Sequence, residues 1–241
     1  MSARQYKNPP IEEAVCEFTF ASSAQQFDLT VPGRLKVHPL MKEYSGEPQT
    51  QNIQVISPNQ LPIFEFRVQL PTGDGRRLVS LRRNTLAISV LRPYDGWPNF
   101  KPRIESVLDA FFDAISQFTV TRIGVKYVNR IIVPMAGAHP ARVLTAPPSE
   151  DKILDACLTN FTQFAEFVRT DKVKVLLTQA TLQPVAQDKT EILLDVDTIW
   201  DHQPLSDRNE IFNMVEKLHE VEGATFERLI TDEARRLFDA G

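Results

Sequence analysis

Three cations recur along one strand-like segment, 119–133, whose sequence is TVTRIGVKYVNRIIV. Arg122, Lys126 and Arg130 occupy even positions, whereas the odd positions are mostly apolar. Because successive side chains of an extended chain point to opposite faces, the three cations are expected on one face of a strand whose other face is apolar. Arginine offers planar donors suited to phosphate or carboxylate, so this face is a candidate site for an anionic ligand.

Two carboxylates give the competing interpretation of the cationic face. Glu13 and Glu17 share one face of an earlier strand, which the alternation of apolar residues predicts over 14–21. If that strand neighbours 119–133, cross-strand ion pairs would each contribute roughly 0.2–1 kcal/mol. The face could therefore be a ladder of ion pairs, an anion-binding surface or a protein interface. The two glutamates also weaken the positive field that a nucleic-acid groove needs.

A second candidate site is the pair Asp195 and Asp197 in the segment ILLDVDTIW. In a strand they share a face, and paired carboxylates can hold Mg²⁺ or Mn²⁺. A third ligand would have to come from Glu191, Asp201 or Asp207. The D-x-D pattern is frequent by chance, and its alternative interpretation is an exposed strand end followed by a turn.

A third candidate is the loop that contains Tyr94 and Trp97 on either side of Asp95 and Gly96. Two aromatic rings beside a glycine could stack on a base or a sugar. The alternative is that they anchor the loop against the helix expected after it.

Composition and missing motifs narrow the classes of function. At 42% hydrophobic and 24% charged residues the chain is ordinary globular material, and its net charge of −4 argues against a uniformly basic nucleic-acid surface. The sequence has no H-E-x-x-H, Walker A or G-x-G-x-x-G pattern, so we expect no cofactor. Cys16 and Cys157 are expected to be buried thiols in a reducing compartment. Without a signal peptide or an apolar stretch of membrane-spanning length, we expect a cytoplasmic protein with no membrane partner.

Hydrophobic periodicity predicts an α+β fold. The expected strands are 14–21, 53–57, 63–70, 77–83, 86–92, 119–133, 161–169, 173–182 and 191–197. The expected helices are 32–44, 99–116 with Asn99 as its N-cap, 149–158, and a closing helix from 206 or 207 followed by a last turn capped by Thr231. One large antiparallel sheet with helices packed on one face would bury these apolar stripes.

The order of these elements suggests how the chain is organised. We expect a single compact unit over 1–241, made of two loosely similar halves, 1–118 and 119–241. Each half would be a strand, a helix, several strands and a helix. This order resembles the saddle-shaped fold of the TATA-binding protein, and that pattern alone assigns no function.

Four segments carry a resemblance to a known family. They are NPPIEEAVCEF (Asn8 to Phe18), RPYDGWPNFKP (Arg92 to Pro102), RIGVKYVNRI (Arg122 to Ile131) and LHEVEGATFERLITDEARRLF (Leu218 to Phe238). They resemble the landmarks of a sporadically distributed family of uncharacterised prokaryotic proteins of about this length. The resemblance implies no activity or ligand. The patchy distribution of that family suggests mobile genes, and by association a place in a defence or toxin–antitoxin module.

The leading hypothesis is a non-catalytic binding or regulatory protein that uses an exposed charged sheet face. Its partner would be another protein, encoded nearby, or an anionic ligand. An exposed sheet edge would also favour a homo-oligomer. The alternatives are a metal-dependent phosphoester-processing enzyme that uses Asp195 and Asp197, and a nucleic-acid-binding protein.

Overall fold

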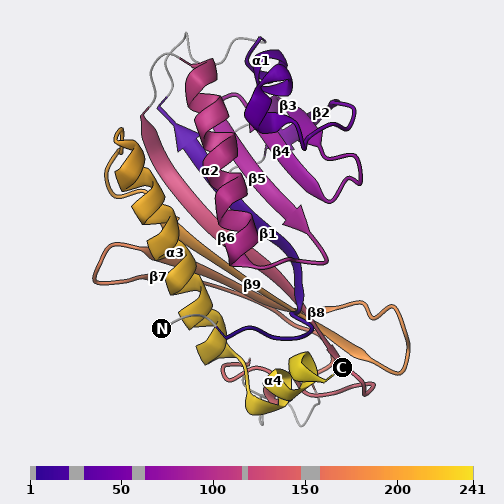
Figure 1. The fold of residues 1–241 in the computed structure, drawn as a ribbon. Helices are drawn as coiled ribbons and strands as arrows, with labels where there is room; N and C mark the ends of the chain where they lie inside the picture. Colours follow the sequence, from indigo (N-terminus) through magenta and orange to yellow (C-terminus); the bar gives the residue numbers. More distant parts are fainter. Residues whose placement is uncertain (1–3, 22–29, 56–62, 116–118, 148–157, 241) are drawn as a thin grey trace. The chain divides into compact units, whose positions relative to one another are not determined.

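A computed structural model of the chain describes residues 4–21, 30–55, 63–115, 119–147 and 158–240. Among these residues the strands are β1 (Ile11–Phe20), β2 (Gln49–Val55), β3 (Ile63–Pro71), β4 (Arg77–Arg82), β5 (Thr85–Leu91), β6 (Val120–Val133), β7 (Thr162–Val168), β8 (Lys174–Leu182) and β9 (Thr190–Trp200). The helices are α1 (Val31–Val37), α2 (Trp97–Ala114), α3 (Arg208–Leu229) and α4 (Asp232–Asp239), with short 3₁₀ turns η1 (Pro39–Met41) and η2 (Pro140–Arg142). Figure 1 shows these elements along the chain.

The strands form a nine-stranded antiparallel sheet in the order β2-β3-β4-β5-β1-β6-β9-β8-β7. The α+β class and the large antiparallel sheet predicted from the sequence are therefore confirmed. The division into two repeated halves is not tested by this order and stays a prediction. In the described part of the chain, no helix is long and apolar enough to cross a membrane.

The chain divides into two compact units that interleave along the sequence. Unit 1 comprises Met1–Ala14, Val125–Trp200 and Glu216–Gly241, and unit 2 comprises Val15–Gly124 and Asp201–Val215. Both β1 and β6 contribute residues to each unit.

In unit 2, α2 packs its apolar stripe on the strands beside it, as Figure 1 shows for β5 and β1. Phe111 of α2 stacks on Phe20 of β1 with ring centroids 4.7 Å apart. Cys16 of β1 is completely buried in this core, and burial raises the pKa of its thiol. Burial of Cys16 agrees with the prediction, whereas Cys157 and the predicted helix 149–158 fall largely outside the described residues.

Two helix boundaries differ from the sequence-based predictions. The helix α2 begins at Trp97, and its N-cap is Gly96, whose φ of 90° suits a residue without a side chain. Asn99 is therefore not the N-cap; its side-chain amide donates to the carbonyl of Asp95 at 2.7 Å.

The predicted helix 32–44 is also wrong in extent. α1 ends at Val37, and a separate 3₁₀ turn begins at Pro39. Proline has no N–H to continue the helical hydrogen bonds, and it disfavours the α conformation in the residue before it, His38. His38 accordingly has extended φ and ψ angles.

In unit 1, the part of α3 from Glu216 onward lies over one face of β6 and β9 (Figure 1). The hydroxyl of Thr198 on β9 donates to the carbonyls of Val125 and Leu218, at 2.9 and 3.0 Å. The Tyr127 hydroxyl on β6 lies 3.2 Å from Nδ1 of His219 on α3. Odd residues of β6 and even residues of β9 therefore face α3. The opposite face of the unit 1 strands β6, β9, β8 and β7 is called the open face below.

The last turn of the chain is capped as predicted. The Thr231 hydroxyl accepts a hydrogen bond from the backbone N–H of Ala234 at 3.3 Å, at the start of α4. The capping oxygen satisfies one of the backbone donors that a helix N-terminus leaves without an intrahelical partner.

Candidate functional site

Alternation along β6 places its three cations on the less buried side of the strand. The odd residues from Ile123 to Val133 are buried, whereas Arg122, Lys126 and Arg130 are half-buried. Arg122 belongs to unit 2, and the other two cations belong to unit 1. Each cation contacts a carboxylate of its own unit.

In unit 2, Arg122 shares the carboxylate of Glu17 with a second arginine. Nη1 of Arg122 lies 2.7 Å from one oxygen of Glu17, and Nη2 of Arg82 lies 2.9 Å from the other. Gly124 leaves room for this arrangement, since a Cβ atom there would lie 3.2 Å from both terminal nitrogens of Arg122. Glu17 therefore joins β1 to its neighbour β6 and to β4, which lies one strand further away beyond β5.

The second predicted glutamate takes no part in such a pair. Glu13 is half-buried on β1, and its carboxylate makes no hydrogen bond or ion pair with the residues that the structure describes. The ion-pair interpretation of the sequence therefore holds for Glu17, while the other two cations find partners elsewhere.

In unit 1, Lys126 contacts Asp195 of β9. Its Nζ lies 2.7 Å from Oδ2 of Asp195, whose side chain is only 15% exposed. The other oxygen, Oδ1, is buried and accepts no hydrogen bond from the described residues. The ammonium group thus already occupies the most accessible oxygen of a carboxylate that was a candidate metal ligand.

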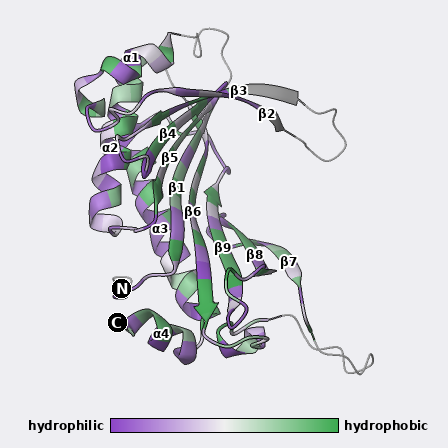
Figure 2. Cartoon of the chain, turned by 90° about the vertical axis from the view of Figure 1, so that its right-hand side faces the viewer, coloured by the Kyte–Doolittle hydropathy of each residue, from purple (hydrophilic) through white to green (hydrophobic). Residues whose placement is uncertain are grey.

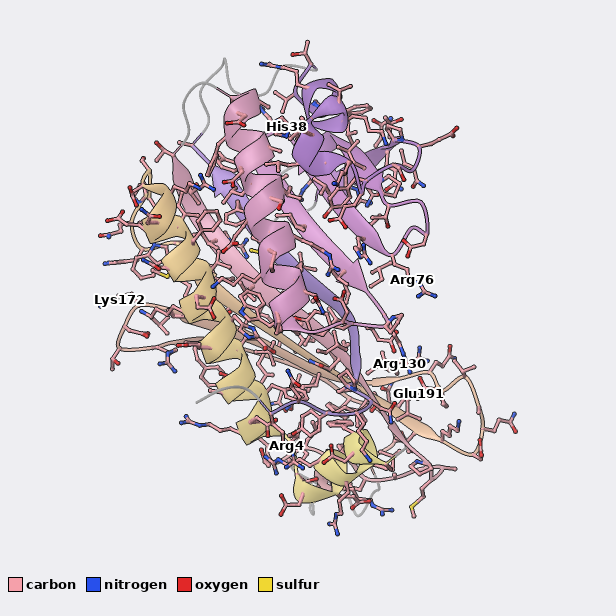
Figure 3. All side chains as sticks on the ribbon, viewed as in Figure 1. Arg4, His38, Arg76, Arg130, Lys172 and Glu191 are labelled. Atoms are coloured by element: carbon pink, nitrogen blue, oxygen red, sulfur yellow. The ribbon has the colours of Figure 1, made fainter. Side chains whose placement is uncertain are left out.

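Arg130 contacts Glu191 of β9, and Figure 3 shows the two side chains next to each other. The carboxylate is almost completely buried, and it also accepts a hydrogen bond from the backbone N–H of Val185 at 3.0 Å. Burial alone would raise the pKa of Glu191, but the hydrogen bonds from Val185 and Arg130 outweigh it and hold that pKa below its ordinary value. Glu191 is therefore an anion in the folded protein.

The metal-site prediction finds limited support in this geometry. β9 continues to Trp200, so Asp195 and Asp197 lie within a strand; the interpretation as an exposed strand end is wrong. Across the described ranges, no three His, Cys, Asp or Glu side chains are close enough to hold a metal ion together. The predicted third ligands Glu191, Asp201 and Asp207 are all described, and none of them forms such a group with the pair, so the metal site stays a prediction.

The aromatic pair of the loop before α2 packs inward. The rings of Tyr94 and Trp97 meet Phe100 edge-on, with centroids 6.2 and 6.0 Å from it, and Phe100 is completely buried. This contact suits the anchoring interpretation, because a ring held against the core has less surface left for stacking on a ligand. Ligand stacking at this loop stays a prediction.

Sequence reasoning missed a cluster on β7, the terminal strand of the sheet in unit 1. Phe164 and Val168 are 64% and 63% exposed on the open face, and Phe167 is 54% exposed on the other face. Register puts Phe164 opposite Thr178, which in turn lies opposite Asp195, so one row crosses the open face. The signal available in the sequence was the segment TQFAEFV, in which large apolar residues occupy both even and odd positions and so lie on both faces of the strand. That pattern is unusual for a strand with one buried face.

The open face of unit 1 therefore combines exposed apolar side chains at its edge with ion pairs nearer β6. The chain matches no protein-family model and no curated protein. On this face Lys126 and Arg130 are each paired with a carboxylate, and the exposed apolar residues of β7 lie where no described α-helix covers the strand (Figure 2).

Proposed function

We propose that this chain is a non-catalytic binding protein that holds a partner protein on the open face of unit 1. The observation that supports this most is the exposure of Phe164 and Val168, two large apolar side chains on one face of a terminal strand. Single exposed apolar residues scattered over a surface are normal, whereas two large ones along the same face of one terminal strand are more typical of an interaction site.

The paired cations support a protein partner better than a small anion. An anion that bound Lys126 or Arg130 would have to compete with Asp195 or Glu191, which already contact them. A protein surface can instead cover such pairs at the rim of an interface, where charged residues contribute mainly to specificity. The partner is therefore proposed to be another protein, and a neighbour in a defence or toxin–antitoxin module is the first candidate.

The same pairing also weighs against the nucleic-acid alternative. Phosphate binding depends on cations whose charge is not cancelled nearby. All three β6 cations lie close to a carboxylate, Arg122 included. The metal-dependent enzyme is kept as an alternative only through Asp195 and Asp197, and a metal titration described in the Discussion separates it from the binding protein.

Capture from a lysate of the native host tests the proposal with two matched variants. Phe164→Asp places a charge on the open face of unit 1, and Phe66→Asp does the same on β3 of unit 2, where Phe66 is 49% exposed. We expect the wild type and Phe66→Asp to retain the same protein, identified by mass spectrometry, and Phe164→Asp to lose it. Equal capture by all three forms would overturn the proposal, provided that circular dichroism shows each variant folded.

A further inference from the structure

The backbone of β7 has one side that its neighbour β8 leaves free. The N–H of Arg169 donates to the carbonyl of Val173, and the N–H of Thr181 donates to the carbonyl of Phe161. In an antiparallel pair, hydrogen-bonded residues alternate with residues whose backbone groups point away. Because 161 and 169 are bonded, the odd residues of β7 face β8, and its even residues present their N–H and C=O groups outward.

The even residues also put their side chains on the open face. Phe164, Glu166 and Val168 lie opposite Thr178, Leu176 and Lys174 of β8. Glu166 is exposed, and among the described residues it makes no hydrogen bond or ion pair. β7 thus offers a row of free backbone groups together with an apolar, acidic, apolar series of side chains.

A second copy of the chain would not complement this series. Two β7 strands that pair antiparallel through their outward residues place an even residue opposite an even residue. In every register that pairs Glu166 with an even residue of β7, it meets Thr162, Phe164, Glu166 or Val168, none of which is a cation. Self-pairing therefore leaves the carboxylate opposite a neutral or like-charged residue, which is neutral or destabilising.

We infer that β7 accepts an extended segment of a different protein as an added strand, with a lysine or arginine opposite Glu166 and apolar residues two positions to either side. Backbone hydrogen bonds supply the affinity in this mode of recognition, and alternate side chains supply the specificity. The flanking apolar residues pair with Phe164 and Val168, as aromatic and β-branched residues do across strands. This inference rests on the proposed function and adds the conformation and charge pattern of the partner.

The test uses labelled peptides of sequence TVTKTVT and TVTETVT, with binding measured by fluorescence anisotropy. Opposite charges across strands are favourable and like charges unfavourable, so we expect the lysine peptide to bind roughly threefold or more tighter than the glutamate peptide. The charge-swapped variant Glu166→Lys should reverse that preference. Methylating the backbone nitrogen of the central lysine should abolish binding, because that N–H faces β7, whereas methylating a threonine nitrogen beside it should not.

Three outcomes would overturn the inference. They are equal binding of both peptides, a preference that survives Glu166→Lys, and a concentration-dependent dimer of the chain alone that Phe164→Lys dissolves in sedimentation analysis. The last would assign the edge to a second copy. If the peptides fail but Phe164→Asp still loses the captured partner, the open face binds without strand addition and the proposed function stands. If neither effect is seen, both proposals fail.

Discussion

Arg130 and Glu191 form an ion pair in which the two side chains differ greatly in exposure: that of Arg130 is 29% exposed and that of Glu191 is 2% exposed. The pair joins β6 to β9, and the carboxylate also holds the backbone of Val185. An anion this deeply buried depends on its partners, because leaving it without its cation would leave a charge uncompensated away from water.

Replacing Arg130 is therefore expected to destabilise the protein, unlike the same change at Arg122. For Arg130→Ala we expect a loss of about 2 kcal/mol in the free energy of unfolding, less than for a fully buried pair because the arginine is partly exposed. Arg122→Ala should lose under about 1 kcal/mol, because Arg82 still contacts Glu17. Urea denaturation measures both. Adding Glu191→Gln to Arg130→Ala should recover part of the loss, and equal effects of the two single changes would contradict this account.

Divalent metal should leave the thermal midpoint unchanged. Nζ of Lys126 is 2.7 Å from Asp195, so a cation arriving at this carboxylate must displace a charge that is already there. We expect Mg²⁺ and Mn²⁺ at millimolar concentration to give no rise in midpoint, since only binding to the folded state raises it. A rise that Asp195→Ala removes would favour the metal-dependent enzyme instead, and Asp188→Ala, at an exposed aspartate outside the predicted ligand set, is the control for binding elsewhere.

A buried carboxyl on α3 predicts a loss of stability at rising pH. Glu222 is 4% exposed, and burial, with a smaller effect of the negative charge of Asp195, raises its pKa well above the ordinary value. At a pH below about 4.3 the group is protonated in both states and has no effect. As pH rises, the unfolded chain releases this proton while the folded chain keeps it, so stability falls until the folded pKa is passed.

Glu222→Gln removes that dependence because the amide does not ionise. We expect the variant to differ little from the wild type at pH 4 and to become progressively more stable than the wild type as the pH rises to 8. Midpoints of thermal unfolding across this range measure it. The control is Glu166→Gln, which replaces an exposed carboxylate and should change the thermal midpoint equally at all these pH values. A gain equal at both pH values would mean that packing, not ionisation, is responsible.

The parts of the fold that sequence could predict are those set by neighbours along the chain. The strand β6 and its cationic face could be predicted because one face of the strand is buried and the other is not, which makes apolar and polar residues alternate in the sequence. The Thr231 cap was readable because capping involves residues within one turn. Gly96 shows that even a local feature can escape sequence-based prediction. This N-cap residue has a positive φ and no polar side chain, so the residue type that usually marks an N-cap is absent from the sequence.

The ion pairs of the candidate site could not be assigned, because they depend on which strands become neighbours. The sequence contained Lys126, Arg130, Glu191 and Asp195, but their pairing follows from β9 lying beside β6, a contact between segments some sixty residues apart. Glu13 and Glu17 were equally plausible partners, because both are acidic and both lie on the same face of β1. Of the two, only Glu17 pairs with a β6 cation. The exposure of Phe164 likewise follows from β7 being the last strand, which no local pattern specifies.

Gly46 and Gly33 of unit 2 should respond oppositely to the same substitution. A Cβ atom at Gly46 would lie 2.8 Å from the carbonyl oxygen of Thr72 and 2.9 Å from Cγ of Pro71, and the former is backbone that cannot turn aside. The N–H of Gly46 also donates to the carbonyl of Pro71 at 3.0 Å, so the two segments cannot separate without losing this bond. We expect Gly46→Ala to lower the free energy of unfolding by about 2 kcal/mol, the range of overpacked sites.

Gly33 lies within α1, and a Cβ atom there would meet nothing within 4 Å. Alanine is favoured over glycine in a helix by about 0.5–1 kcal/mol, so Gly33→Ala should stabilise the protein by up to that amount. Urea denaturation of both variants gives the comparison directly. If Gly46→Ala proved neutral, the close approach of that loop to Thr72 would not exist in solution; if Gly33→Ala proved destabilising, α1 would pack there against a surface outside the described residues.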